Sequence, residues 1–225
     1  PAMSIPELIR LLMKEGMDFE QSFNIAQRTF SYTNHTVMGE ALEKWPLDLL
    51  RSVVPEIVDI ILRIDERLKQ EAPQLFIVKD NTAHMANLSI YVGSYVNGVA
   101  AIHTEILKND CFKDWYQVFP QRFQNKTNGV TPRRWMGLCN PELTQLIKYR
   151  VGGDFLKDMD KLAKLKPMID DDMVNQFNAI KRAKKEQLCK VIAEKEGVQL
   201  NPDFIFDVQV KRLHEYKRQL MNALS

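Results

Sequence analysis

The sequence predicts an α/β protein in which helices predominate. Three observations lead to this fold class. The first seventy residues carry apolar side chains at helical spacing, and the residues between Leu75 and Ala101 change to short apolar runs separated by glycines. Near the end, an apolar run at residues 204–210 leads directly into a basic segment at residues 211–218. A strand followed by a helix is the unit from which open α/β sheets are built.

Two short helices are predicted at the start of the chain. Ser4 is followed three residues later by Glu7, which is the spacing of a capping box, and Gly16 is placed to end the helix. Asp18 and Gln21 repeat the capping-box spacing, so we expect a second helix to begin there and to end before a polar, β-branched stretch.

A third helix is predicted to follow Pro55 and to stop before Pro73, because apolar residues between them recur at helical spacing. Beyond it, the runs at residues 76–78 and 88–92 indicate short strands. We therefore expect a small sheet or a winding core loop in this part of the chain.

Two more helices are predicted in the second half. Asn140 and Pro141 are suited to cap the first, which Gly152 ends, and Asp170 opens a long helix that Gly197 closes. Its lysines are expected to form a solvated face. Five of its apolar residues are expected to face inward: Val174, Phe177, Ile180, Leu188 and Val191.

Composition and charge exclude several classes of function. The 31 Lys and Arg nearly balance the 29 Asp and Glu, so a net charge of +2 gives no general attraction to nucleic acid or to an acidic membrane. No stretch reaches the roughly 18 apolar residues of a membrane span, and the N-terminus lacks the layout of a secretory signal. We expect a cytoplasmic protein without nucleic-acid or membrane partners.

Metal chemistry and disulfides are not expected either. Three cysteines at wide spacing, Cys111, Cys139 and Cys189, form no metal-binding pair and indicate buried free thiols. The four histidines are equally scattered.

The basic segment is the strongest candidate site. Lys211, Arg212, Lys217 and Arg218 follow a strand that is predicted to be buried, and Lys217 lies about one helical turn after His214. Ligands of open α/β sheets bind at such strand ends. Two phosphate groups held close together repel, so a site that holds both needs this kind of Arg and Lys cluster. A basic, solvent-facing helix is the alternative.

Two further candidates are polar loops. Asn128 can donate and accept hydrogen bonds to a sugar hydroxyl, Gly129 allows close backbone approach, and Trp135 offers a flat face to a ring. A turn followed by a helix with Pro132 in its first turn explains the same residues. His35 lies in the other loop, and a lone histidine is more often structural.

Four motifs occur in a recognisable order and spacing. They are NHTV at residues 34–37 with EALEKWP at 40–46, VNGVA at 96–100, TNGVTPRRW at 127–135 and FDVQVKRLHEYKRQ at 206–219. Together they resemble the α-glucan phosphorylases, the family of glycogen, starch and maltodextrin phosphorylases. The resemblance covers essentially the whole chain.

The resemblance implies a piece of a two-domain, Rossmann-like glycosyltransferase of the GT-B type. Residues 1–125 would be the end of the N-terminal domain, and residues 126–225 the start of the C-terminal catalytic domain. The implied reaction transfers a terminal glucosyl unit of an α-1,4-glucan to inorganic phosphate and yields glucose 1-phosphate. The chain begins at Pro1 and stops within a helical pattern, so we expect an internal fragment.

The resemblance also implies a role for each site residue that matches a family motif. Arg212 and Lys217 would hold the substrate phosphate, and Lys211 and Trp135 would contact the cofactor, pyridoxal phosphate, whose phosphate takes part in proton transfer.

The remaining matched residues concern the sugar. His35 and Asn128 would bind glucosyl hydroxyls, with Tyr216 beside them. Gly39 departs from the family pattern, because many relatives have proline there, and this would loosen the loop after His35.

Two parts of the family's active site are absent from this sequence. The family's N-terminal glycine-rich loop and the lysine that binds the cofactor covalently lie outside these residues. We therefore expect the isolated chain to be inactive. The resemblance also implies that the full-length protein is a homodimer.

Two other functions fit parts of the sequence. A glycosyltransferase of the same architecture that uses a nucleotide sugar would need cations at a strand end but no pyridoxal site. A helical module that binds a polyanion would use the basic segment alone, although the near-zero net charge argues against it.

Overall fold

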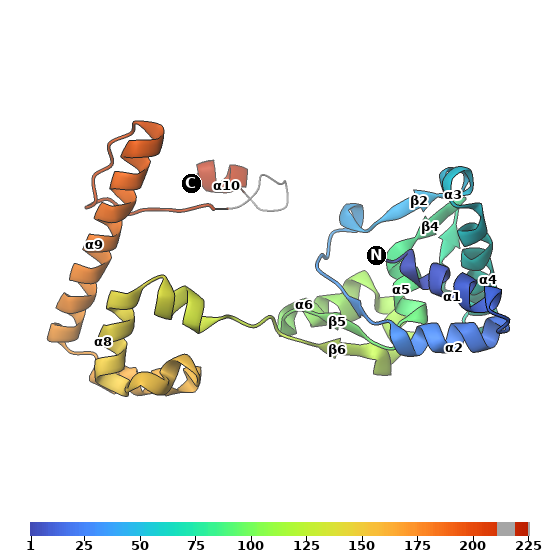
Figure 1. Cartoon of the computed structure of the whole chain (residues 1–225), viewed down its shortest axis with the longest axis horizontal. Coiled ribbons are helices and arrows are strands. Elements are labelled where there is room, and N and C mark those ends of the chain that lie inside the picture. Colours follow the sequence, from blue (N-terminus) through green and yellow to red (C-terminus); the bar gives the residue numbers. More distant parts are fainter. Residues whose placement is uncertain (211–218, 225) are drawn as a thin grey trace. The chain divides into compact units, whose positions relative to one another are not determined.

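The computed structural model describes residues 1–210 and 219–224 of the 225-residue chain. The chain divides into two compact units, Pro1–Gly129 and Val130–Ser225. The predicted α/β class with a helical majority agrees with the first unit, which holds all strands of the described residues, whereas the described part of the second unit is helical (Figure 1).

The first unit contains most of the elements. Its helices are α1 (Ser4–Lys14), α2 (Phe19–Thr29), α3 (Leu47–Val53), α4 (Pro55–Glu71), α5 (Met85–Val92), α6 (Ala101–Ile106) and α7 (Lys113–Val118). Its strands are β1 (Tyr32–Thr33), β2 (Lys44–Pro46), β3 (Val78–Lys79), β4 (Thr82–His84), β5 (Val96–Gly98) and β6 (Phe123–Asn125).

The N-terminal helices confirm one predicted cap and correct the other. At α2, the Asp18 carboxylate accepts from the Gln21 backbone N–H at 2.8 Å, and the Gln21 side chain accepts in return from the Asp18 N–H. The capping box at α1 is wrong, because the helix has already begun at Ser4. The Glu7 carboxylate instead accepts from the Arg10 guanidinium at 2.7 and 2.8 Å.

Helix α4 supplies the centre of the core and follows Pro55 as predicted. Its inward face carries a buried carboxylate, Asp65, which is 2% exposed. Asp65 Oδ1 accepts from the backbone N–H groups of Ile77 at 2.7 Å and Val78 at 3.0 Å, and Oδ2 pairs with Lys69 at 2.6 Å. These bonds fix the entry to β3, because a buried carboxylate is stable only when its oxygens have partners.

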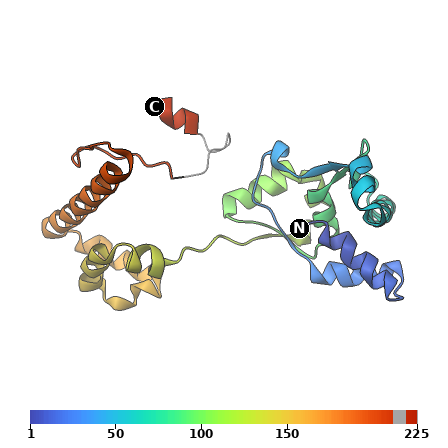
Figure 2. The ribbon, with the colours of Figure 1, turned by 45° about the horizontal axis from the view of Figure 1, so that its top comes forward.

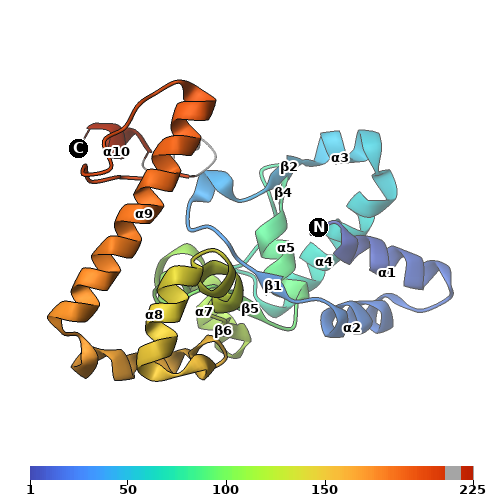
Figure 3. The ribbon, with the colours of Figure 1, turned by 60° about the vertical axis from the view of Figure 1, so that its left-hand side comes forward.

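The predicted strand at residues 88–92 is wrong, because these residues form the second half of helix α5. Seven of its eight residues are buried, and the eighth, Asn87, donates to the Phe76 carbonyl at 2.8 Å. A helix buried on every side has no polar face, so its apolar run cannot be distinguished from a strand by periodicity. The predicted small sheet is present around it: Figures 1 and 3 show α5 between two three-stranded sheets.

The two sheets differ in the relative direction of their strands. The order β2-β4-β3 is antiparallel throughout, with Trp45 opposite Ala83 and Val78 opposite Ala83. The order β1-β5-β6 is parallel throughout, with Tyr32 opposite Val96 and Val96 opposite Phe123. All three carboxyl ends of the parallel sheet therefore lie along one edge.

A glycine allows α6 to pack directly on the parallel sheet. A Cβ built on Gly98 would lie 2.9 Å from the backbone N and Cα of Thr104, and closer still to its hydroxyl oxygen. Thr104 is buried, and its hydroxyl oxygen lies 2.9 Å from both the Ala100 carbonyl and Asn125 Oδ1, which share its one proton. Strand β5 and the start of α6 therefore tolerate no side chain at Gly98.

The second unit consists of helices and loops. Its α-helices are α8 (Pro141–Val151), α9 (Asp171–Glu196) and α10 (Gln219–Leu224); α9 is the long orange helix in Figure 2. The predicted caps are confirmed: Asn140 and Asp170 accept from backbone N–H groups three residues on, and Gly152 and Gly197 end the helices with positive φ. Arg150 of α8 joins the two helices, because its guanidinium pairs with Asp170 and Asp172 at the start of α9.

Two predictions of burial in this unit are wrong. Val174, Phe177, Leu188 and Val191 of α9 are 38–44% exposed, and no residue of α9 is fully buried. The run at residues 204–210 belongs to no strand, and Ile205 is 96% exposed. Within the described residues no neighbouring strand pairs with this run, and an extended segment becomes a strand only through such pairing.

The cysteines are free as predicted, but they are not buried: Cys139 is exposed, and Cys111 and Cys189 are half-buried. In the part of the chain that the structure describes, no cluster of His, Cys, Asp or Glu could hold a metal ion. No helix of those residues is long and apolar enough to span a membrane.

Replacing Gly98 by alanine is expected to lower the free energy of unfolding of the first unit by about 1–3 kcal/mol, because the new methyl group overlaps the Thr104 backbone. Urea unfolding measures the change. Gly39→Ala is the matched control, since an added Cβ there has nothing within 4 Å, and it should change stability by less than about 0.5 kcal/mol. Equal effects of the two substitutions would contradict the close-approach argument.

Candidate functional site

The carboxyl edge of the β1-β5-β6 sheet brings two predicted site residues to one place. His35 lies two residues after β1, and Asn128 lies three residues after β6, the other outer strand of the sheet. Both side chains are exposed. Ligands of parallel sheets bind outside the carboxyl ends of the strands, so the two residues occupy the expected edge.

Asn34 connects the loop after β1 to the rest of this edge. It is 1% exposed, and both its amide nitrogen and its amide oxygen form hydrogen bonds. The amide Nδ2 donates to the Tyr32 hydroxyl at 3.0 Å, and Oδ1 accepts from the Thr36 backbone N–H at 2.9 Å. A second donor, His103 Nε2, lies 3.1 Å from the same Oδ1. The backbone on either side of His35 is therefore held by one buried amide.

The hydrogen bonds of His103 determine which of its nitrogens carries the proton. The backbone N–H of Val99 donates to Nδ1 at 3.0 Å, so Nδ1 is unprotonated. In the neutral ring the proton is then on Nε2, which donates to Asn34 Oδ1. His103 of α6 thus links the loop after β1 to the loop after β5.

The third loop joins through the backbone. The Asn128 N–H donates to the Val99 carbonyl at 2.9 Å, and the Lys126 N–H donates to the Gly98 carbonyl at 3.1 Å. At the base of these loops, the Thr33 hydroxyl donates to Asn97 Oδ1 at 2.7 Å. The three loops therefore form one hydrogen-bonded edge.

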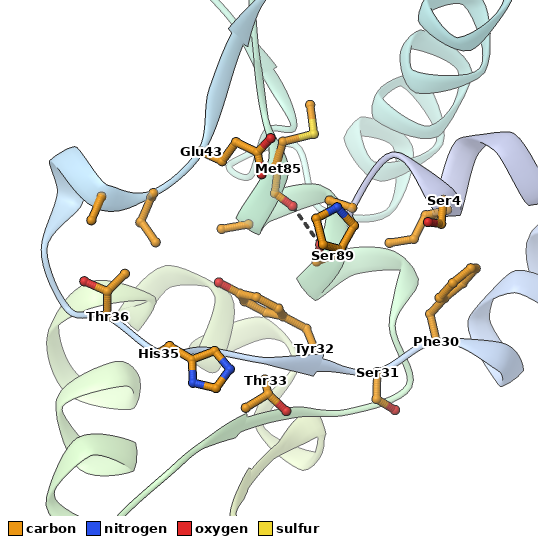
Figure 4. A pocket seen from close by; sticks show the side chains of 16 residues that line it. Ser4, Phe30, Ser31, Tyr32, Thr33, His35, Thr36, Glu43, Met85 and Ser89 are labelled. Atoms are coloured by element: carbon orange, nitrogen blue, oxygen red, sulfur yellow. Dashed lines mark hydrogen bonds between the residues drawn. The ribbon is translucent and has the colours of Figure 1, made fainter. Parts of the chain in front are cut away.

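A cavity of about 580 Å³ opens beside this edge (Figure 4). The side chains of Glu43 and Met85 lie across it from Tyr32 and His35. The cavity is large enough for a small organic ligand. Its polar lining comprises Ser4, Ser31, Tyr32, Thr33, His35, Thr36, Glu43 and Ser89.

Most polar groups at this edge are neutral, with Lys126 after β6 and Glu43 across the cavity as charged neighbours. Burial, assisted by the nearby His35, lowers the pKa of His103, so its ring is held neutral. Burial also raises the pKa of the Tyr32 phenol, although the hydrogen bond from Asn34 opposes this shift. Neutral amide, imidazole and hydroxyl groups are suited to orient an uncharged, hydroxyl-rich ligand, and they lack the cations that a phosphate requires.

The other predicted site residues lie elsewhere in the chain. Lys211, Arg212, Tyr216 and Lys217 lie outside the described residues. Trp135 lies in the second unit, on the π-helical segment Arg133–Leu138, with 64% of its surface exposed.

Sequence reasoning missed Asn34 and His103 as parts of the site. Both fall within or beside the matched motifs, but neither side chain was given a role. The one signal was their place in or beside the matched motifs, because their meeting requires the strands that precede them, β1 and β5, to be parallel and adjacent. That adjacency depends on the strand order, which the sequence pattern did not reveal.

Comparison with known proteins identifies the family. A family model described as carbohydrate phosphorylase matches residues 1–225. The chain belongs to the carbohydrate phosphorylase family. The resemblance stated from the four motifs is thus confirmed.

Several phosphorylases align with the whole chain. A maltodextrin phosphorylase of Streptococcus pneumoniae is 46% identical over 100% of this chain and 30% of its own length. The muscle form of human glycogen phosphorylase is 42% identical, and the brain form of the sheep enzyme 41% identical, each over 100% of this chain and 28% of the relative. The chain therefore spans less than a third of the phosphorylases that it matches.

His103 gives this phosphorylase chain a testable pH dependence. Because its pKa is lowered in the folded state, the unfolded chain takes up a proton as the pH falls through about 6.5, whereas the folded chain takes it up only at lower pH. The stability contributed by the neutral ring is complete above that pH and decreases below it. His103→Gln should therefore make the free energy of unfolding less dependent on pH between about 7.5 and 5.5.

Urea unfolding at a series of pH values measures this slope. His84, whose pKa is lowered by burial and by Lys44 and Lys79, remains in both proteins and cancels from the difference. Identical slopes for the two proteins would show that folding does not lower the pKa of His103, and would contradict the prediction.

Proposed function

We propose that this chain is part of an α-1,4-glucan phosphorylase, which transfers a terminal glucosyl unit to inorganic phosphate and releases glucose 1-phosphate. The observation that carries the proposal is the shared edge of the parallel sheet, where the loops of His35 and Asn128 are joined by hydrogen bonds. Relatives named maltodextrin phosphorylase and glycogen phosphorylase, at 42–46% identity, support the same reaction.

The proposed roles follow from the chemistry of each group. His35 and Asn128 orient the hydroxyls of the glucosyl unit, with Tyr216 beside them, because imidazole, amide and phenol groups can donate and accept to a neutral sugar. Arg212 and Lys217 hold the incoming phosphate, for which a planar fork and a point charge are suited.

The cofactor in this proposal is pyridoxal phosphate, and Lys211 and Trp135 would hold it. When bound, it supplies a phosphate group for proton transfer to and from the substrate phosphate. The exposed indole of Trp135 is compatible with this role, because a flat face is available to a planar ring. The net cationic character of residues 211–218 fits two phosphate groups side by side.

The proposed architecture is a two-domain, GT-B type glycosyltransferase that forms a cytoplasmic homodimer. Residues 1–125 would end its N-terminal domain and residues 126–225 would begin its C-terminal domain. The division of the chain into Pro1–Gly129 and Val130–Ser225 supports a boundary in this region. The chain alone would be inactive, since the cofactor-anchoring lysine of the family has no counterpart among the matched motifs.

The test uses the full-length protein that carries this chain. It should degrade maltoheptaose with inorganic phosphate and without a nucleotide sugar. Arg212→Ala is expected to raise the apparent KM for phosphate, or lower kcat, by roughly a hundred-fold, because a charge-assisted pair to the reacting anion is lost. Initial rates at varied phosphate concentration measure this.

Arg51→Ala is the matched control, because among the described residues Arg51 pairs with the neighbouring Asp48 alone, at the surface of α3. It should leave the phosphate dependence unchanged. An unaltered phosphate response in the Arg212 variant would remove this residue from the site, and a requirement for a nucleotide sugar would replace the proposed reaction.

A further inference from the structure

We propose that His103 is a positioning residue, which holds the His35 loop and the Asn128 loop in a fixed relation through hydrogen bonds to Asn34 and Val99. The inference rests on the proposed function, because it assigns the alignment of the two sugar-binding loops to a side chain that need not touch the sugar.

The contacts form one continuous path across the sheet edge. The Thr36 N–H and His103 Nε2 both donate to Asn34 Oδ1, at 2.9 and 3.1 Å. On the other side of the ring, His103 Nδ1 accepts from the Val99 N–H at 3.0 Å, and the Val99 carbonyl accepts from the Asn128 N–H at 2.9 Å. His103 is the single side chain of this path that bridges two loops.

Removal of the ring takes one hydrogen bond from each of its two partners. The Val99 N–H loses its acceptor, and Asn34 Oδ1, in a side chain that is only 1% exposed, loses one of two donors. The Val99 N–H, in a half-buried residue, would then be left without its acceptor, and an unpaired polar group shielded from water is costly, so the loops would move to recover partners or water. Movement of Val99 would carry Asn128 with it through their backbone hydrogen bond.

The chemistry of the ring explains why a histidine is suited here. The position requires an acceptor on one side and a donor on the other within one rigid group, which neutral imidazole provides. A glutamine amide also offers an oxygen acceptor and an N–H donor, whereas leucine offers neither. A comparison of His103→Gln with His103→Leu therefore separates the effect of the hydrogen bonds from the effect of side-chain volume.

The first experiment measures the loops directly in the full-length protein. Hydrogen–deuterium exchange should be faster in His103→Leu than in the wild type for the segments around residues 34–37 and 126–129. His103→Gln should lie near the wild type. His84→Leu is the control, because His84 packs edge-on against Phe76 in the other sheet and should leave these segments unchanged.

The second experiment measures the reaction. In His103→Leu, kcat/KM for maltoheptaose should fall roughly a hundred-fold, since small displacements of orienting groups have effects of this size, while the apparent KM for phosphate changes less than about two-fold. His103→Gln should recover most of the loss. A merely structural role would instead reduce the active fraction and leave both KM values unchanged.

The outcomes separate this inference from the proposed function. If the wild type shows no phosphorolysis, the proposed function fails and the positioning role fails with it. If the wild type is active and His103→Leu retains its kcat/KM for the glucan, or exchange in the loops is unaltered, the positioning role alone is overturned. Equal loss in the Gln and Leu variants would also overturn it, because the hydrogen bonds would then be irrelevant.

Discussion

Three strands of two or three residues each must remain parallel for the two sugar-binding candidates to share an edge. Ladders this short contribute few hydrogen bonds, and isolated strands of such length are not stable in water. Side chains compensate: Thr33 bonds to Asn97 across β1 and β5, and Thr104 bonds to Asn125 beside β6. The close packing of α6 on Gly98 makes this arrangement possible.

This constraint explains why we assign sugar binding and phosphate binding to different sets of residues. The sheet edge of the first unit presents imidazole, amide and hydroxyl groups, and burial keeps the His103 ring neutral. The cations that a phosphate requires are concentrated in the sequence at residues 211–218. A phosphorylase has to bring an uncharged sugar and a charged acceptor together, and these two kinds of side chain lie in different parts of the sequence.

The sequence predicted those elements whose signals are local. Asp18, Asn140 and Asp170 each cap a helix through a side chain and a backbone N–H three residues away, so the pattern alone was sufficient. One local signal also failed, because the capping-box spacing at Ser4 lies in a helix that has already begun there. The other failures occur where the outcome depends on distant neighbours. Burial on all sides gave α5 the composition of a strand, and the run at residues 204–210 has no strand beside it in the described residues. His35 and Asn128 were found from their motifs, whereas their connection through His103 depends on the strand order.

The most direct measurement is a crystal structure of the full-length protein with a maltooligosaccharide bound. The account predicts that the side chains of His35 and Asn128 both form hydrogen bonds to hydroxyls of one glucosyl unit, beyond the carboxyl ends of β1 and β6. A glucosyl unit bound at another surface, with either side chain turned away from it, would contradict the central claim.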